Sequence, residues 1–444
     1  MENTTLIVRD FKQKYRMIDR AEGIYVYDTD GKRYIDGTSG SAAVSSIGHG
    51  VPEVVNAIHT QLQKYAYSPG HYFANEPARE LADLLASITP QGLNQVWLVC
   101  DGTEATEAAV KFARQYHQEA GRPTKSLVIS RWQSYHGATI AALGYGGHTY
   151  RRRKFYPMYE NTPHVPAAYC YRCYFGQKYP QCGIRCAQAL DQEIQQQGPQ
   201  NVAAFIAEPL VGAALGAVAP VKEYFPMIRE ICDRHEVLLI ADEVMTGFGR
   251  TGEMFAMQHW NVKPDIMTCA KAISGGYVPL GAAVLDEKII ALMKRKDSNV
   301  ISGHTYGSHH VMAAAAVAVI QYILEHDLVS RARENGAYFL RAMEKLALHR
   351  IVGDVRGMGL FAGVEFVKDQ TTREPFDTQL RIADQVGWAA LDRGLITYPG
   401  SGNVDGVSGD HLLLAPPLII ETQQIDQLVQ ILDESIAAVE QEVI

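Results

Sequence analysis

The 444-residue chain lacks an excess of positive charge and lacks any apolar run long enough to cross a membrane. Its formal net charge is −8, whereas nucleic acid and anionic membrane surfaces select basic proteins. A transmembrane helix needs about 20 mostly apolar residues, and residues 1–15, MENTTLIVRDFKQKY, contain no apolar signal-peptide core. We therefore expect a cytoplasmic protein that binds neither nucleic acid nor membrane.

Cysteine is also scarce, and the count of seven is odd, which argues against a full disulfide framework. Four cysteines nevertheless cluster in the segment CYRCYFGQKYPQCGIRC, as Cys170, Cys173, Cys182 and Cys186. Their C-x2-C and C-x3-C spacings suit a small structural zinc site. The alternative, which we favour, is a set of reduced thiols in a loop that its aromatic residues and proline order without metal. Both interpretations make the segment structural.

Several common catalytic motifs are missing. The sequence contains no G-x4-G-K-[ST], no H-E-x-x-H and no G-x-S-x-G, so a phosphate-loop enzyme, a zinc protease and an α/β-hydrolase lack their defining residues. The stretch GMGLFAG (357–363) has misspaced glycines and precedes a predicted strand, which favours a structural role over a dinucleotide-binding loop. The basic run YRRRK (150–154) is interpreted as a solvated turn.

What the chain does contain is a long alternation of helical patterns with short apolar runs, from about residue 75 to residue 310. Such alternation predicts an α/β domain with a mostly parallel central sheet. The first 60 residues read as short strands around an Asp30–Gly31 turn, and the last part as mixed helix and strand. We expect residues 61–310 to form the large domain, with segments 1–60 and 311–444 combining into a smaller α+β domain.

Four short stretches place chemically useful groups at the ends of predicted strands, where sites in such sheets collect. In VCDGTEATEAAVKFAR, Gly102 and Thr103 form a turn before a helix, whose free amides suit a phosphate. In SYHGAT, Tyr135 could stack on a flat ligand, although a core tyrosine is an equal alternative. Asp242 ends the run VLLIAD and could bind Mg²⁺ or a protonated ring nitrogen.

The fourth stretch, DIMTCAKAISGGYVPLGA (265–282), surrounds Lys271 with small apolar residues. A lysine in a desolvated pocket has a depressed pKa and serves as a nucleophile or Schiff-base former, although a stray surface charge is the simpler interpretation of this stretch alone. Taken in order, a phosphate cradle, a stacking ring, a pyridinium partner and this lysine predict a site for pyridoxal 5′-phosphate.

On these stretches, and above all on ADEVMTGFGRTGEMFA followed by PDIMTCAKAISGGYVPLGA, the chain resembles the class III pyridoxal-phosphate-dependent aminotransferases. These enzymes have fold type I and include ω-amino acid and amine transaminases. The resemblance implies that Lys271 forms a Schiff base with the cofactor and that Asp242 pairs with its ring nitrogen. It further implies a homodimer, or a dimer of dimers, with active sites at the interface. The remaining cofactor-binding residues that it implies are Gly102, Thr103, Tyr135, His136, Glu208, Val244 and Thr305, the last reaching the neighbouring subunit's site.

Departures from the family pattern bear on the substrate. Asp101 stands where Ser or Asn is usual, so we expect its carboxylate to turn away from the phosphate or to cap the helix. Ala138 replaces the arginine of acetylornithine and ornithine members. The segment EPLVGAALGAV lacks the acidic residue that those and the 4-aminobutyrate members carry.

No arginine precedes the C-terminal PPL, where amine:pyruvate members place one to clamp a carboxylate. A 2-oxo acid would then need another cation, from Arg151–Arg153 or from His411. By analogy, the front of the pocket would be lined by Ser39, Ser41, Tyr72 and Phe73.

The expected activity is transfer of an amino group from a primary amine or an ω-amino acid to a 2-oxo acid such as pyruvate. The same scaffold also carries amino-acid racemases or epimerases, aminomutases and decarboxylases, which the shared motifs do not separate from transaminases. A non-catalytic binding protein would have lost Lys271 or Asp242, and both are present.

Overall fold

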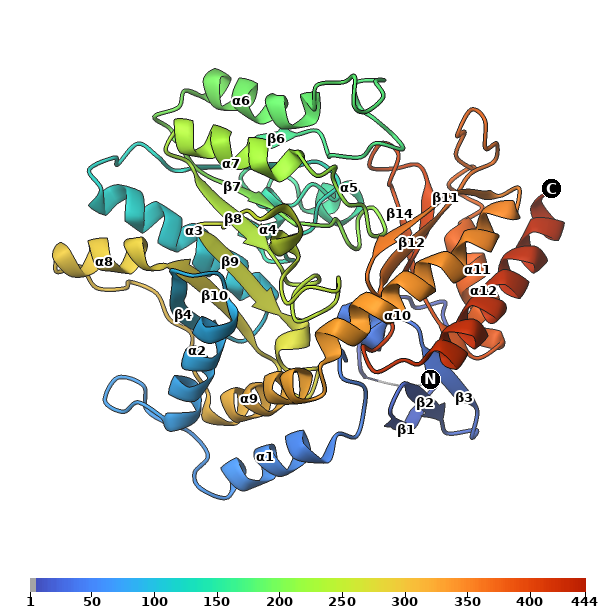
Figure 1. Cartoon of the computed structure of the whole chain (residues 1–444), viewed down its shortest axis with the longest axis horizontal. Helices are drawn as coiled ribbons and strands as arrows, with labels where there is room; N and C mark the ends of the chain where they lie inside the picture. The colour runs from blue at the N-terminus through green and yellow to red at the C-terminus, as the bar shows by residue number, and fades with distance from the viewer. Residues whose placement is uncertain (1–4) are drawn as a thin grey trace.

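A seven-stranded sheet forms the centre of the molecule in the computed structural model, which describes residues 5–444 (Figure 1). β10 runs antiparallel to both of its neighbours, β4 and β9, while the pairs from β9 through β8, β7 and β5 to β6 are parallel. The predicted mostly parallel α/β sheet is therefore confirmed. The strands, in their order across the sheet, are β4 (Leu93–Val99), β10 (Gly281–Asp286), β9 (Ile266–Ala270), β8 (Leu238–Asp242), β7 (Val202–Ala207), β5 (Leu127–Arg131) and β6 (His164–Val165).

Helices cover both faces of this sheet, because its strands are apolar on both sides. Successive side chains of a strand point to opposite faces. Phe205 of β7 packs in one core cluster with residues of α6 and α7, whereas its neighbours Ala204 and Ile206 pack in another with residues of α3 and α8. In Figure 1, α6 and α7 lie at the top and α3 and α8 at the left of the sheet. These helices are α3 (Gly102–Glu119), α6 (Arg185–Gln197), α7 (Tyr224–Arg234) and α8 (Glu287–Arg295).

Two four-stranded sheets make up the other part of the molecule, on the right of Figure 1. One is antiparallel, in the order β11 (Val352–Met358), β12 (Phe361–Phe366), β15 (Asp410–Leu414) and β14 (Tyr398–Ser401). The other runs β1 (Ile18–Glu22), β2 (Tyr25–Asp28), β3 (Arg33–Asp36) and β13 (Leu395–Ile396). β13 pairs in parallel with β3, so both ends of the chain contribute to this smaller part, as expected. The boundaries at residues 60 and 310 stay a prediction.

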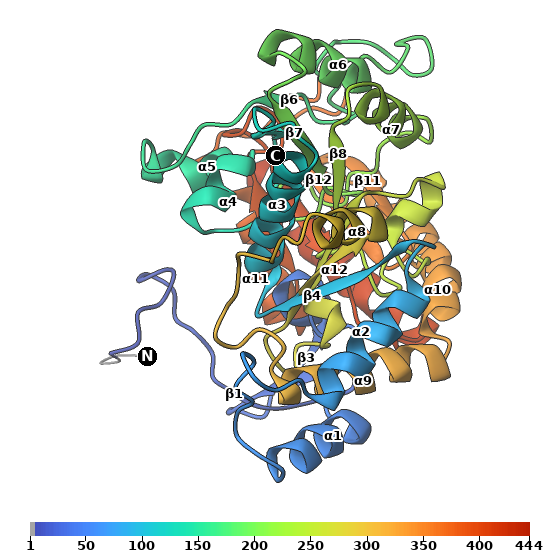
Figure 2. The same ribbon diagram turned by 90° about the vertical axis from the view of Figure 1, so that its left-hand side faces the viewer.

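The remaining α-helices connect these layers. α9 packs against α1 and α2, and α12 packs against α10 and α11; Figure 2 shows α1, α2 and α9 together at the lower edge of the molecule. Their bounds are α1 (Pro52–Leu62), α2 (Glu76–Ile88), α4 (Ile140–Tyr145), α5 (Thr149–Arg152), α9 (His310–Glu325), α10 (Leu328–Met343), α11 (Ile382–Asp392) and α12 (Thr422–Val443). Across residues 5–444, no single helix is long and apolar enough to cross a membrane; α9 and the following helical stretch pass such a test only as a pair bent by 63°.

The basic run YRRRK differs from its prediction as a solvated turn. It forms α5 and the 3-10 turn η2 (Arg153–Phe155), and the side chain of Arg152 is buried. The Arg152 guanidinium donates to Gly146 O at 2.9 Å and to Tyr159 Oη at 3.1 Å. The prediction holds for Tyr150, Arg153 and Lys154, which are exposed, and was wrong at Arg152. A guanidinium can be buried when carbonyl and hydroxyl oxygens accept its hydrogen bonds.

The cysteine segment forms turns that lead into α6. All seven cysteines are free, and Cys170, Cys173, Cys182 and Cys186 border one small cavity. Within the described part of the chain, no three or more His, Cys, Asp or Glu side chains are arranged to hold a metal ion.

Candidate active site

The candidate site is a cavity of about 430 Å³ at the carboxyl ends of β7, β8 and β9. Each of these strands ends next to an acidic or basic residue of the cavity: Glu208 after β7, Asp242 at the end of β8 and Lys271 after β9. Parallel strands bring their carboxyl ends to one edge of a sheet, which is where ligands of open α/β sheets bind. The cavity has the volume of a typical small-molecule site.

Lys271 stands at a sharp change of backbone direction. β9 ends at Ala270, and Lys271 opens the 3-10 turn η4 (Lys271–Ile273) with φ of +51°, in the left-handed region that costs a non-glycine residue about 1–3 kcal/mol. Burial lowers the pKa of its amine to about 8, with a further lowering from the positive charge of Arg151, against the opposing effect of Asp242 and Glu208. At a pKa of about 8, roughly a fifth of the amine is neutral near physiological pH, far more than for a solvated lysine, and the neutral form is the one that acts as a nucleophile or base.

Asp242 is held in one orientation by two hydrogen bonds. Its Oδ2 lies 2.7 Å from Nδ1 of His136, and its Oδ1 accepts the backbone N–H of Val244 at 3.1 Å. The carboxylate is 4% exposed. The other ring nitrogen of His136, Nε2, is buried and has no hydrogen-bond partner in residues 5–444. The imidazole is therefore held on its Asp242 side alone.

Glu208 links two segments of the cavity wall. Its Oε1 accepts the backbone N–H of Tyr135 and its Oε2 that of Gly212, both at 3.0 Å. Burial raises the pKa of the Glu208 carboxyl above its ordinary value, while the nearby His136 and the two amide donors act in the opposite direction. Glu208 therefore positions Tyr135, whose ring borders the cavity.

The first turn of α3 borders the same cavity. The backbone amides of a first helical turn have no intrahelical partner, so they are free to bind a ligand. Asp101 is the N-cap, and its side chain accepts the N–H of Glu104 at 2.8 Å, which confirms its predicted capping role. A Cβ on Gly102 would lie 2.9 Å from Cγ1 of Val244, so only glycine lets these two walls approach. Gly102 and Thr103 both line the cavity beside Lys271.

Eight of the predicted cofactor-binding residues thus meet in one place. The cavity lining includes Gly102, Thr103, Tyr135, His136, Glu208, Asp242, Val244 and Lys271. Sequence reasoning missed other lining residues, such as Val44, Met245 and Tyr277, because apolar and aromatic residues that suit a core equally well carry no signal of a site, even where they stand close to Asp242 or Lys271. Asp242 and Lys271 were found because each ends an apolar strand pattern.

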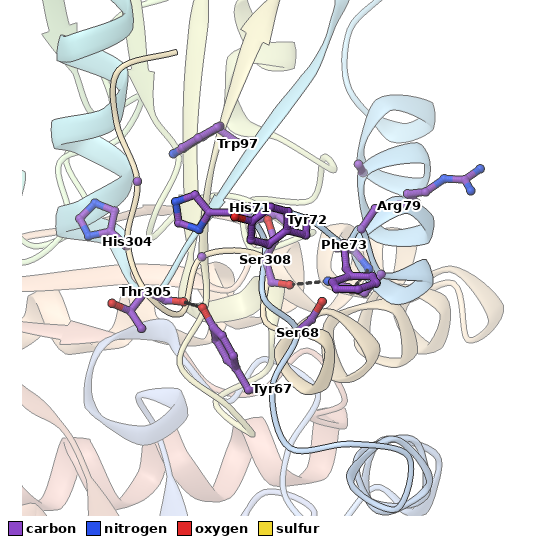
Figure 3. A pocket seen from close by; sticks show the side chains of 18 residues that line it. Tyr67, Ser68, His71, Tyr72, Phe73, Arg79, Trp97, His304, Thr305 and Ser308 are labelled. Carbon is purple, nitrogen blue, oxygen red and sulfur yellow. Dashed lines mark hydrogen bonds between the residues drawn. The ribbon is translucent and has the colours of Figure 1, made fainter. Parts of the chain in front are cut away.

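Thr305 lies elsewhere, in a second cavity of about 1040 Å³ (Figure 3). Tyr67 donates its hydroxyl to Thr305 O at 2.7 Å, and Tyr72 and Phe73 line the same cavity with mostly exposed rings. Tyr72 and Phe73 were expected at the front of the Lys271 pocket, and within one chain they do not line it. The segment before α2 carries them to this separate cavity, close to the segment before α9.

Two further pocket expectations also differ. Ser39 is buried and donates to Ala415 O at 2.6 Å, so its hydroxyl is taken up by the protein. His411 is fully buried, and burial lowers the pKa of its imidazole to about 3. A neutral imidazole supplies no positive charge for a carboxylate, which excludes His411 as the expected cation.

Comparison with known proteins identifies the family of the chain. The model of the class-III aminotransferase family matches residues 8–436. The uncharacterized aminotransferase YodT of Bacillus subtilis is 40% identical, over 98% of this chain and 98% of its own. Putrescine–pyruvate aminotransferase of Pseudomonas aeruginosa is 34% identical, over 96% of this chain and 92% of its own. The ω-transaminase of Pseudomonas jessenii, solved in complex with PMP, superposes with a TM-score of 0.90 at 31% identity, covering 97% of this chain and 94% of that one.

The chain therefore belongs to the class-III aminotransferase family. It is a fold-type-I enzyme that transfers amino groups, and its family depends on pyridoxal 5′-phosphate.

Proposed function

We propose that this aminotransferase binds pyridoxal 5′-phosphate in the Lys271 cavity and moves an amino group from a primary amine or an ω-amino acid to a 2-oxo acid such as pyruvate. The observation that carries the proposal is the convergence, in one cavity, of a half-buried lysine with a lowered pKa, an oriented aspartate and the first residues of α3. The putrescine–pyruvate relative supports the substrate class.

The residues fit this cofactor group by group. The amides at the start of α3, with the Thr103 hydroxyl, suit a phosphate dianion. Asp242, oriented by His136, suits a protonated ring nitrogen. Tyr135 and Val244 border the cavity and offer apolar walls for a flat ring. When bound, the cofactor supplies an electron sink for the carbanion left by proton removal and carries the amino group between substrates.

Lys271 moves the proton in this proposal. Its Nζ would hold the cofactor covalently and, when free, would take the proton from the substrate carbon that bears the amino group. A neutral amine is needed for both tasks, and burial provides it by lowering the pKa of Lys271 to about 8. The small apolar neighbours of Lys271, Ala270 and Ala272, are themselves buried and keep water away from the amine.

We also infer that the working enzyme is a cytoplasmic homodimer. The cavity around Thr305 is rimmed by exposed Tyr72 and Phe73, and a second copy of the chain would cover them. The resemblance that places Thr305 at the neighbouring subunit's phosphate supports the same assignment. Docking there would also bring Tyr72 and Phe73 to the front of the partner's pocket, where sequence reasoning expected them.

The cofactor proposal is tested with the visible absorption spectrum of the protein after addition of pyridoxal 5′-phosphate. We expect a Schiff-base band in the wild type, its loss in Lys271→Ala, and its retention in Lys368→Ala, which removes a surface lysine paired with Glu374. A Lys271→Ala protein that keeps the band and the activity would overturn the assignment.

The reaction is tested by adding single amines and following both the band and the products. Loss of the band together with release of a carbonyl product supports transamination. If amino acids lose only their optical purity, and no carbonyl product forms, the protein acts as a racemase.

A further inference from the structure

The proposed 2-oxo acid substrate carries a carboxylate, and the charged lining of the Lys271 cavity is poorly suited to it. Its charged walls include the carboxylates of Asp101, Glu208 and Asp242 against the single amine of Lys271. An anionic group brought into a partly desolvated site needs a positive partner. The arginine that related amine:pyruvate enzymes place before the PPL segment is absent.

Most arginines near the site already serve the protein's own backbone. Arg131 is buried and donates to the carbonyl oxygen of Glu208. Arg250 is buried and donates to Leu360 O at 3.1 Å and to Ser39 Oγ at 3.1 Å. Arg152, buried, holds the loop around Gly146. Moving any of these guanidinium groups to a substrate would leave buried oxygens unpaired.

Arg151 differs from these arginines in its position and its partners. It is half-buried on α5, with its guanidinium carbon 4.5 Å from the centre of the Tyr135 ring. Its Nη2 donates to the hydroxyl of Tyr398, on β14, at 2.9 Å. No carboxylate of residues 5–444 lies within 4 Å of it, so its charge is unpaired.

Two observations place this charge beside the reacting centre. Tyr135, the ring below the Arg151 guanidinium, lines the same cavity as Lys271. The positive charge of Arg151 also helps to lower the pKa of the Lys271 amine, which requires the two groups to be near each other. Tyr398 lies on β14, in the smaller part of the molecule, so this contact joins that part to α5 (Figure 1).

We propose that Arg151 binds the carboxylate of the 2-oxo acid, and of the amino acid formed from it, with the Tyr398 hydroxyl as a second donor. This inference rests on the proposed transamination and names the residue that selects its acceptor. A guanidinium offers five N–H donors in a planar fork that matches a carboxylate with two parallel hydrogen bonds. Within residues 5–444, only one of these donors has a hydrogen-bond partner.

The same arrangement explains how the site accepts an amine that has no carboxylate. When no carboxylate is present, the guanidinium remains over the Tyr135 ring, which stabilises a cation electrostatically. Arg151 therefore needs no anionic partner during the amine half of the cycle. It engages the acid during the other half.

The test compares two carbonyl substrates that differ only in the carboxylate, pyruvate and acetaldehyde, each reacted with the aminated holoenzyme. We expect Arg151→Ala to lower kcat/KM for pyruvate by about 100-fold, mainly through KM, and to leave the acetaldehyde reaction within about threefold of wild type. Arg151→Lys keeps the charge but loses the planar fork, so its kcat/KM for pyruvate should lie between those of the wild type and Arg151→Ala. Arg153→Ala, two residues away, exposed and over Tyr150, is the matched control.

A second readout does not depend on turnover. Calorimetric titration of the holoenzyme with pyruvate should show weakened binding in Arg151→Ala and unchanged binding in Arg153→Ala. Equal losses with both carbonyl substrates, or no loss with pyruvate, would overturn the role of Arg151 while leaving transamination intact. A wild-type enzyme that converts neither substrate, and no other 2-oxo acid, would overturn the proposed function itself.

Discussion

Lys125, which is buried, and Lys271, which is half-buried, show how the surroundings of a single residue decide its chemistry. The Nζ of Lys125 donates to three carbonyl oxygens, of Pro199, Val202 and His235, at 2.8–3.0 Å. All three of its protons are used, which suits a structural cation. The Nζ of Lys271 makes no hydrogen bond to residues 5–444 and faces the cavity. Burial lowers the pKa of both amines, but only Lys271 is free to react.

The lowered pKa predicts how covalent capture of pyridoxal 5′-phosphate by the cofactor-free protein depends on pH. Below the pKa of about 8 the Lys271 amine is mostly protonated, so the rate should rise about tenfold per pH unit. Above that pH the amine is neutral and the rate should level off. The absorbance of the Schiff base, followed between about pH 6 and pH 9, measures this. A rate that kept rising to about pH 10 would mean an ordinary, solvated lysine.

Sequence patterns predict a residue's place well when a single local element sets it. Asp242 and Lys271 each follow an apolar strand pattern, and Gly102 and Thr103 open a helix, so their convergence followed from the sheet alone. Arg151 could not be placed in this way. Its partners, Tyr135 and Tyr398, lie in distant segments. The pattern around it predicted a solvated turn, and the sequence offered Arg151–Arg153 and His411 as cations without choosing among them.

The strand β8 ends at Asp242, and a second carboxylate, Glu243, follows it directly. Successive side chains of an extended chain point to opposite faces, so the two carboxylates bind different groups. Asp242 faces the cavity, whereas Glu243 is fully buried elsewhere and holds the 3-10 turn η3 (Ala256–Trp260). Its two carboxylate oxygens accept the N–H groups of Ala256 and Met257, at 3.0 and 2.8 Å. Thr246 donates its hydroxyl to the same carboxylate. One side chain therefore ties the turn to the end of the strand that carries Asp242.

Removal of this contact should destabilise the fold. Glu243→Ala leaves two buried N–H groups unpaired, and we expect a loss of about 2–4 kcal/mol in the free energy of unfolding. Urea denaturation followed by tryptophan fluorescence measures it. The control is Glu253→Ala, which breaks a surface ion pair with Arg333 and should cost at most about 1 kcal/mol. Equal stability of the two variants would contradict the assigned role of Glu243.

At the scale of the whole molecule, the linings of the Lys271 cavity and the Thr305 cavity suit different partners. The first is bordered by buried charged groups and suits a small polar ligand. The second is broad and lined by rings such as Tyr72, which is 87% exposed, and Phe73, which is 65% exposed. Exposed rings of this size are typical of protein interfaces.

A dimer formed through this surface predicts a solution mass of about twice the 49.1 kDa of the chain. Phe73→Asp should shift the protein toward the monomer in light scattering coupled to size-exclusion chromatography, because a buried unpaired charge opposes association. It should also weaken retention of pyridoxal 5′-phosphate. Trp388→Asp, at an exposed ring on α11, should leave both unchanged. A Phe73→Asp protein of unaltered mass would place the interface elsewhere.

The predicted fold class was confirmed because apolar strand patterns in the sequence determine it. No such pattern determines the quaternary structure. The apolar strands β7, β8 and β9 leave no alternative to a sheet covered on both faces. Tyr72 and Phe73 carry no comparable pattern, since an aromatic pair before a helix suits a core, a pocket or an interface equally well. Their common cavity with Thr305 appears only once α2 and α9 are packed together.

The parallel pairing of β3 with β13 also sets the order of events during synthesis. The edge of β3 at residues 35 and 36 stays unpaired until residues 395 and 396 of β13 have left the ribosome. The central sheet, whose strands lie between residues 93 and 286, is complete on the chain long before then. Nascent chains that stop short of residue 395 should therefore carry a folded centre with an open N-terminal strand edge, and such an edge is a template for aggregation. Demand for chaperones should consequently be greatest just before translation ends.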